Sequence, residues 1–325
     1  GQYFVPTVGG GIIASMKNGQ EWVSLNAVLP NLTLQPYPSN PWTAESFSGF
    51  KYGIKSPHFY PSYRIRKSDM LTSSQDSVRI AWIRQYASQL APSWDAAVAL
   101  AVDGSGNVYV TGWGTKLPYG TDYVTIKYDR SGRQVWLARY DNGGDDLASA
   151  IAVNAAGNVY VTGTSIGVGA GEEFATVKYN SNGVQQWVAR YSGPGNSSGR
   201  AAGVVLDNFG DVLVSGSSGE SELYYATTVK YTSEGVQQWV ARYDWPGNFS
   251  NWVSTLAVDG SGNIYLAGGT QGKSGYADYL ALKYRPDGTN LWAARYNGPR
   301  NEEDHVSTIA LDGSGNVYGT GTSFL

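Results

Sequence analysis

Aromatic side chains in the segments between repeated motifs are the strongest candidates for binding chemistry in this 325-residue chain. They stand beside Asn, Asp and Gly, in segments that differ from one repeat to the next. Exposed rings in such a setting suit stacking on sugar rings or anchoring a protein partner, and the alternative is burial against neighbouring loops. The candidate ligand-binding residues are Trp94, Trp113, Tyr119, Tyr224, Trp245, Phe249, Trp252 and Tyr276.

Groups that could support catalysis are sparse. The two histidines, His58 and His305, lie in no recognisable motif, although His305 follows a carboxylate cluster at 301–304. The acidic pairs at 145–146 and 172–173 are predicted to be solvated loop charge. Paired carboxylates hydrolyse glycosides when held about 5–10 Å apart, and nothing in the sequence fixes such a distance. We therefore expect no catalytic residues and do not expect an enzyme. The alternative is a hydrolase or lyase, which acidic residues gathered around His305 at one end of the fold's central channel would favour.

Metal and cofactor motifs are equally weak. Each glycine turn of the type Asp103–Asn107 offers one carboxylate, and Asn154 replaces the Asp in one copy. Calcium prefers six to eight oxygen ligands, so a turn without metal is expected, and no phosphate-binding loop suggests a cofactor. Three Asn-x-Ser/Thr triplets leave glycan attachment open, at Asn31, Asn196 and Asn248.

Two markers recur with one period of just over fifty residues. A tryptophan that precedes a tyrosine by four residues recurs with spacings of 54, 51, 52 and 53 residues, at Trp82, Trp136, Trp187, Trp239 and Trp292. A turn with glycine at its fourth position keeps the same period, at Gly106, Gly157, Gly210, Gly262 and Gly315. The repeat is therefore the unit of folding, and function is to be sought where the copies differ.

One copy predicts four short strands. Apolar runs at 97–102, 108–111, 123–128 and 134–140 are separated by glycine turns and by a variable loop at 112–122. This pattern is typical of an antiparallel sheet, and the constant turn glycine indicates a backbone φ above zero. Four-stranded units repeated around an axis predict an all-β protein, a β-propeller.

Residues shared by every copy are expected to be scaffold. Each third-strand lysine and fourth-strand arginine is followed by a tyrosine, which predicts regular cross-strand contacts. The tryptophans are expected to pack between blades. The residues are Lys127, Lys178, Lys230, Lys283, Arg139, Arg190, Arg242 and Arg295.

Several of these motifs resemble one family. The segments 103–112, 123–128, 185–191 and 237–243 resemble the bacterial β-propeller repeats called SBBP, and the resemblance covers about 79–325. It implies a propeller of exported bacterial surface proteins that are usually without known catalysis. It implies no catalytic residues to carry over.

The domain organisation follows from the repeats. Residues 1–58, rich in Pro and aromatics, are predicted to form an extended arm, and 59–325 a propeller with repeats at about 97–140, 147–191, 200–243 and 252–296. The last copy, 305–325, lacks two strands, which we expect from 60–86, so that N- and C-terminal strands close five blades. A start at Ile12 keeps six blades possible, because 18–23 echoes the glycine-to-tryptophan hairpin.

Composition limits the partners. The formal net charge is −3, with 15% charged residues, which argues against general nucleic-acid binding. Residues 1–90 carry eight basic and four acidic side chains, a net of +4, so the remainder carries −7. The basic part is expected against the acidic part, in its own molecule or a neighbour, unless the asymmetry is compositional drift. The chain has no cysteine and no apolar stretch long enough to span a membrane.

These observations favour a non-enzymatic, extracellular or cell-surface protein. The preferred function is binding or adhesion, with a glycan or protein held by variable loops. The alternative is a structural subunit of a surface assembly or filament, a homo-oligomer in which residues 1–58 dock on a neighbouring subunit. For an exported protein, the start at Gly1 without a signal peptide indicates the processed form.

Overall fold

The computed structural model describes residues 81–88, 95–116, 120–167, 171–220, 223–247, 250–271, 275–298, 301–313 and 315–323, and the backbone of three short strands nearer the N-terminus. Its internal contacts divide the chain into two units, Gly1–Ile80 and Ala81–Leu325. In the first unit, an antiparallel sheet of order β1-β2-β3 comprises β1 (Tyr3–Pro6), β2 (Ile12–Ser15) and β3 (Trp22–Ser24). Part of the segment predicted as an extended arm therefore consists of paired strands.

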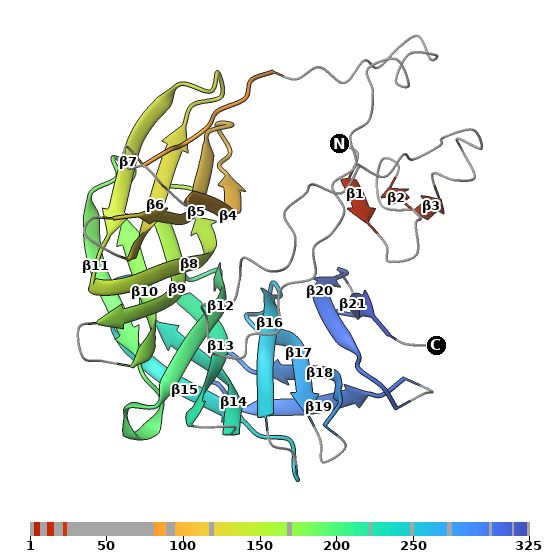
Figure 1. Cartoon of the computed structure of the whole chain (residues 1–325). Coiled ribbons are helices and arrows are strands. Elements are labelled where there is room, and N and C mark those ends of the chain that lie inside the picture. The colour runs from red at the N-terminus through yellow and green to blue at the C-terminus, as the bar shows by residue number, and fades with distance from the viewer. Residues whose placement is uncertain are drawn as a thin grey trace, which may run out of the picture. The chain divides into compact units, whose positions relative to one another are not determined.

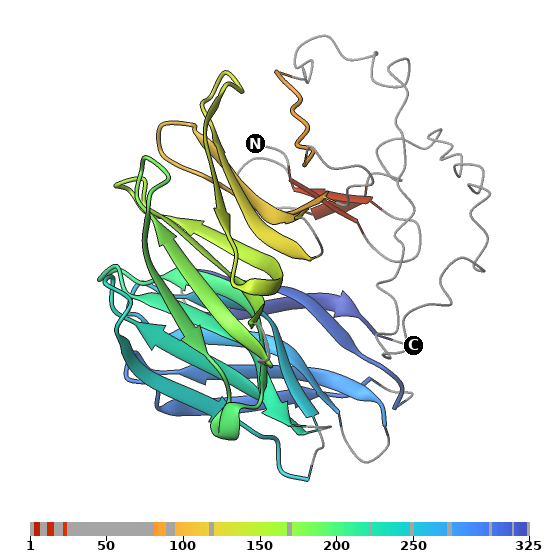
Figure 2. The same ribbon diagram turned by 60° about the vertical axis from the view of Figure 1, so that its left-hand side comes forward.

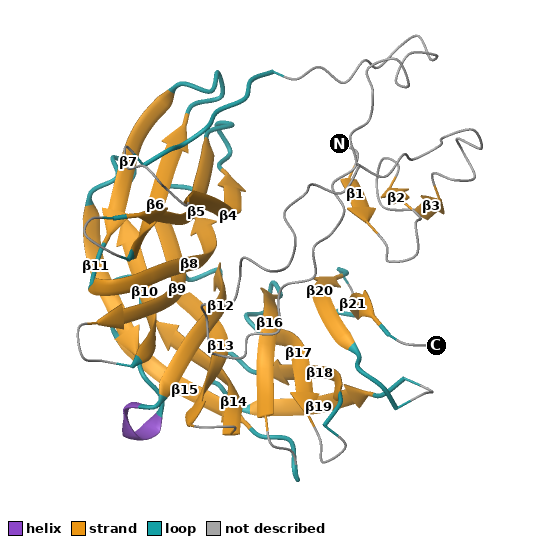
Figure 3. Ribbon diagram, viewed as in Figure 1, coloured by secondary structure: helices purple, strands orange, loops and turns teal. Residues whose placement is uncertain are grey.

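The second unit contains five repeats of one sheet (Figure 1, Figure 3). Repeat 1 comprises β4 (Asp95–Val102), β5 (Val108–Thr115), β6 (Thr121–Tyr128) and β7 (Gln134–Tyr140). Repeat 2 comprises β8 (Gly143–Val153), β9 (Val159–Gly167), β10 (Glu172–Tyr179) and β11 (Gln185–Tyr191). Repeat 3 comprises β12 (Ser198–Leu206), β13 (Val212–Glu220), β14 (Leu223–Tyr231) and β15 (Gln237–Tyr243).

Repeat 4 comprises β16 (Ser250–Val258), β17 (Ile264–Gln271), β18 (Ala277–Tyr284) and β19 (Asn290–Tyr296). Repeat 5 has two strands in the described residues, β20 (His305–Leu311) and β21 (Val317–Thr322). Neighbouring strands within each repeat pair antiparallel in chain order, and a single parallel bridge from Tyr224 to Ser250 joins repeats 3 and 4. The prediction of an all-β fold of four-stranded antiparallel sheets is confirmed, and one short 3-10 turn, η3 (Pro194–Asn196), interrupts it.

Successive sheets pack through their first strands. β8 lies against β4 and β12, and β16 lies against β12 and β20. Figures 1 and 2 show these first strands on the inner side of the series and the fourth strands on the outer side. The apolar core lies between sheets: one cluster joins Tyr160 and Phe174 of repeat 2 to Val204 and Val214 of repeat 3. Within the described residues the series does not close on itself.

The repeated tryptophans of the first four copies each pack on a turn glycine of the repeat that follows. A Cβ atom at Gly183 would lie 2.7 Å from the Trp136 ring, and Gly132, Gly235 and Gly288 are crowded in the same way by Trp82, Trp187 and Trp239. The indole N–H of Trp136 also donates to the Ser181 carbonyl at 3.0 Å. The expected role of these tryptophans between repeats is confirmed for the first four, whereas Trp292 remains 37% exposed.

The other scaffold predictions concern turns and lysines. The five turn glycines have φ between +78° and +81°, as predicted. Third-strand lysines lie over cross-strand tyrosine rings in three repeats, with Lys127 Nζ 5.1 Å from the Tyr109 ring centroid. In repeat 3 Leu213 stands in the tyrosine's place, and Lys230 instead pairs with Asp207 at 2.9 Å.

Candidate functional site

Every first strand contains a β-bulge at the same point, opposite a glycine of the second strand. In repeat 1 the partners Ala97–Gly112 are followed by Ala99–Thr111, which leaves one extra residue on β4. The same shift occurs after Ala148, Ala201, Val253 and Val306. Bulges redirect side chains and are common beside binding sites.

The glycine is required at this point because backbone atoms fill the space that a side chain would need. A Cβ atom would lie between 1.8 and 2.1 Å from the carbonyl oxygen of the residue that precedes the bulge pair. This clash occurs in all five repeats, at Gly112, Gly163, Gly216, Gly268 and Gly321. The main chain of the first strand is therefore fixed by close backbone packing, whatever side chain it carries there.

We call the residue whose carbonyl packs on this glycine the pre-bulge position. It is occupied by Ala96, Leu147, Arg200, Trp252 and His305, five different residue types in five otherwise similar strands. Its cross-strand neighbour compensates for size: Trp113 pairs with Ala96, and Gly269 pairs with Trp252. The pre-bulge position is thus a variable side chain on a constant backbone, at the strand end where the variable loops also lie.

Three consecutive pre-bulge residues carry polar or aromatic groups. The Arg200 guanidinium forms two hydrogen bonds with the Glu172 carboxylate, one of them 2.8 Å from Nη2 to Oε1, and these raise the arginine pKa. The His305 Nε2 atom lies 3.3 Å from Glu303 Oε2. The Trp252 ring lies beside Gly269 of β17, and its centroid is 6.4 Å from that of the His305 ring on β20.

A buried asparagine positions the two neighbouring tryptophans. Asn251 is fully buried, and its Nδ2 donates to Asp244 Oδ1 at 2.9 Å. Its Oδ1 accepts from Thr270 Oγ1 at 2.8 Å and from the backbone N–H of Trp245 at 3.3 Å. The loop that leads into β16 is therefore held to the sheet beside Trp252.

The predicted aromatic candidates fall into three groups. Trp113, Tyr224 and Trp252 lie on strands β5, β14 and β16, so their assignment to loops is wrong. The strands extend past the expected loop boundaries because the close glycine–carbonyl packing continues the pairing there. Trp245 is half-buried against the core between repeats 3 and 4, and Tyr276 is 46% exposed in a loop. Trp94, Tyr119 and Phe249 lie outside the described residues.

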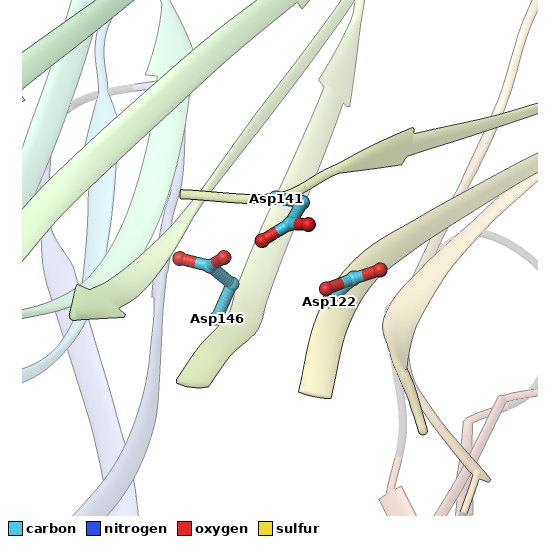
Figure 4. Close-up of side chains that lie close together, drawn as sticks. All are labelled: Asp122, Asp141 and Asp146. Atoms are coloured by element: carbon cyan, nitrogen blue, oxygen red, sulfur yellow. The ribbon is translucent and has the colours of Figure 1, made fainter. Parts of the chain in front are cut away.

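Three aspartates gather between repeats 1 and 2 (Figure 4). One carboxylate oxygen from each of Asp122, Asp141 and Asp146 lies within 4.8 Å of the others. Lys116 Nζ contacts Asp141 Oδ1 and lies 3.4 Å from Asp122 Oδ1, while Arg139 Nη1 lies 2.9 Å from Asp122 Oδ2. An ammonium and a guanidinium therefore supply positive charge that a metal ion would otherwise bring.

The two members of the predicted 145–146 acidic pair differ in environment. Asp145 is exposed, as expected of solvated charge, but it lies on β8 and not in a loop, and it accepts from the backbone N–H of Thr121 at 3.0 Å. Asp146 is fully buried on β8, which corrects that prediction for its partner in sequence. Burial raises the Asp146 pKa, although the Asn142 backbone N–H donates to its Oδ2 at 2.7 Å. Similarly, Glu172 and Glu173 lie on β10 and pair with Arg200 and Arg190.

The remaining candidates are placed separately. His305 pairs with Glu303, while Asp304 of the same predicted cluster is buried and accepts from the Gly298 backbone N–H at 2.6 Å. Asn196 ends η3 with a φ of +59°. His58, Asn31 and Asn248 lie outside the described residues. No helix in the described part of the chain has the length and apolar character needed to cross a membrane.

Comparisons with known proteins find similar solved structures but no similar family or curated protein. No family model matches the sequence, and no curated protein matches it. Sixty-two chains of solved structures match the fold. One is the crystal structure of a protein of unknown function from Dyadobacter fermentans DSM 18053, with 12% sequence identity and a TM-score of 0.45. The match covers 65% of this chain and 65% of the length of that protein.

Proposed function

We propose that the chain is a non-enzymatic, extracellular β-propeller of the SBBP type that binds a glycan or a protein through its variable-loop end. The observation that carries this proposal is the pre-bulge position. A constant backbone presents Ala96, Leu147, Arg200, Trp252 and His305 at equivalent places beside the variable loops. Constant scaffold with local variation is how repeat proteins form binding surfaces.

The exposure of β4, the first strand of the first repeat, and the contacts of the residues before it favour a closed ring of five blades. Leu100 of β4 is 67% exposed, although the equivalent Val204 and Leu256 are buried against the preceding repeat at 6% and 9%. A blade before repeat 1 would cover Leu100. We propose that β20 and β21 supply half of this blade and residues 60–86 the other half; six blades remain the second possibility.

Residues preceding repeat 1 support this arrangement. The part of the expected fourth strand that the structure describes, residues 81–86, has no regular secondary structure, which corrects the prediction of a strand there. Nevertheless Trp82 packs on Gly132, and its indole N–H donates to the Arg130 carbonyl at 3.2 Å. Arg139 also donates to the Tyr86 hydroxyl, as Arg190 does to Tyr140. These are the contacts that fourth strands make elsewhere.

Binding is tested with a glycan array and a pull-down on the whole chain. Replacement of Trp113 or Trp245 by Ala should abolish capture of the glycan or protein ligand, while the circular dichroism spectrum remains that of the folded protein. Phe209→Ala is the matched control, because Phe209 is 80% exposed in a turn at the opposite end of its sheet. If array and pull-down are both empty, the binding function is wrong.

The second candidate is a structural subunit of a surface assembly. The exposed apolar residues of β4, Val98, Leu100 and Val102, favour it, because a neighbouring molecule can cover them as well as a blade of the same chain. Deletion of residues 1–58 should then leave a folded monomer. An oligomer whose size is unchanged by that deletion, measured by light scattering, would exclude a docking arm.

A further inference from the structure

The pre-bulge residues of repeats 3, 4 and 5 form a row on three adjacent inner strands. Arg200, Trp252 and His305 occupy the same register on β12, β16 and β20, and these strands lie against one another in that order. The row begins with a guanidinium, continues with an indole and ends with an imidazole. We propose that it is a subsite for a neutral saccharide, with the sugar ring on Trp252. This inference rests on the proposed binding function.

The strand opposite Trp252 leaves room for its indole ring. Gly269 is the cross-strand partner of Trp252, and a Cβ atom there would lie 2.1 Å from Trp252 Cζ2. The equivalent residues in the other repeats all carry side chains: Trp113, Thr164, Ser217 and Thr322. One side of the indole therefore packs on the β17 backbone, and the half-buried ring keeps part of its surface accessible. An indole fixed in this way is suited to contact the apolar face of a sugar.

The polar groups on either side favour an uncharged ligand. Arg200 is already paired with Glu172, and His305 with Glu303. Their side chains remain between 24% and 50% exposed, so their polar atoms are accessible. An anionic ligand would have to displace Glu172 from the guanidinium, which costs the two hydrogen bonds between them. A hydroxyl both donates and accepts, and it can bridge such a pair without displacing either member.

The site is also preorganised. The carbonyl groups of all three residues are fixed against glycine. Asn251 forms two hydrogen bonds with the adjoining loop, to Asp244 and Trp245, and two with the neighbouring strands, to Tyr224 and Thr270. Binding therefore costs little ordering of the main chain. The same rigidity allows substitution of these side chains with little effect on the backbone.

The test is an array of neutral oligosaccharides and uronic-acid oligosaccharides, followed by calorimetry on the whole chain with the neutral sugar that binds best. Trp252→Ala and Arg200→Gln should each weaken that binding at least tenfold. Phe209→Ala is the matched control, because it removes an exposed aromatic side chain of repeat 3 at the opposite end of the sheet and should leave affinity within twofold. Unfolding curves establish that each variant is folded; if Trp252→Ala is not, Arg200→Gln and His305→Gln decide.

The outcomes separate this inference from the proposed function. Saccharide binding that is lost in Trp113→Ala but kept in the Trp252, Arg200 and His305 variants overturns the subsite and leaves the function standing. Preference for uronic-acid sugars, or capture of proteins without any saccharide binding, overturns the neutral-saccharide ligand. An array and pull-down that are both empty overturn the function itself.

Discussion

At the scale of single residues, one carboxylate organises the glycine turn in four of the five repeats, and Asn154 takes its place in repeat 2. Asp103 Oδ1 accepts from the backbone N–H groups of Ser105 and Asn107 at 2.9 and 3.0 Å. Its Oδ2 accepts from Asn107 Nδ2 at 2.8 Å and from the Tyr109 hydroxyl at 2.9 Å. Burial raises the Asp103 pKa, but these hydrogen bonds outweigh it and bring the pKa down to about 2. The acceptor sites of the carboxylate are filled by the protein itself.

The Asp103→Asn variant should show how much the charged carboxylate contributes to the free energy of unfolding, because that contribution depends on pH. Because the folded pKa lies below the ordinary value of 3.8, the stabilisation is complete above about pH 4 and disappears as the pH falls through 2. We expect the variant to lose on the order of 1–2 kcal/mol of unfolding free energy at pH 7, allowing for solvent screening, and almost none at pH 2. Urea titrations from pH 7 to 2 measure the difference.

The equivalent turn of repeat 2 provides the control. Asn154 makes the same two backbone hydrogen bonds without a titratable group, at 3.1 and 2.9 Å. Asn154→Ala should therefore lower stability by an amount that does not change with pH. A pH-independent loss in Asp103→Asn as well would show that the carboxylate charge has no part in the turn.

Sequence alone predicted these turns well because their chemistry is local. The glycine with positive φ and the capping Asp or Asn lie within five residues of each other. The pre-bulge residues had no such signal. Only Trp252 was predicted from the sequence to bind a ligand, because it is aromatic, and His305 was considered only for catalysis. Arg200 and Leu147 become comparable with them only once the register is known.

At the scale of strands, the bulge depends on the absence of a side chain from the second strand. A Cβ atom at Gly163 would lie 2.1 Å from the Leu147 carbonyl oxygen and 2.7 Å from Ala148 Cα. Neither atom can retreat without breaking the pairing of β8 with β9. The repeated Val-Thr-Gly and related triplets of the sequence show where the glycine lies. They do not show the bulged residue opposite it, because no particular residue type on the first strand marks a bulge.

Gly163→Ala should accordingly be strongly destabilising. The clash of the new methyl group with the backbone is expected to lower the free energy of unfolding by about 3 kcal/mol, as measured by urea titration. Gly104→Ala serves as the control, because nothing lies within 4 Å of a Cβ atom there, and its effect should stay within about 0.5 kcal/mol. Equal stability of the two alanine variants would mean that the close packing at the bulge is not maintained in solution.

At the scale of the whole molecule, each repeat depends on its neighbour. Trp187 packs on Gly235, and its indole N–H donates to the Ser233 carbonyl at 3.0 Å. The order and spacing of the repeats from residue 95 onward were predictable from the period. Ring closure, which the sequence also predicted, stays a prediction, because it depends on contacts between the most distant parts of the sequence and on residues 60–80, which lie outside the described residues.

Leu100→Lys measures closure directly. If a blade covers β4, as we propose, the lysine should lower the unfolding free energy by about 2–3 kcal/mol, because it replaces a buried leucine by a charge. Val184→Lys is the control, since Val184 is also exposed, at 57%, but lies in a turn. A Leu100→Lys protein as stable as that control would indicate that β4 stays open to solvent.

The glycine–carbonyl contact has a consequence for how such a protein can change. Because the main chain, and not the side chain, anchors each inner strand, we expect a mutation at one pre-bulge residue to leave the backbones of the other four repeats in place. Gene duplication followed by drift at these codons can therefore alter ligand preference one repeat at a time. Randomising the five codons together should yield a library in which most members still fold.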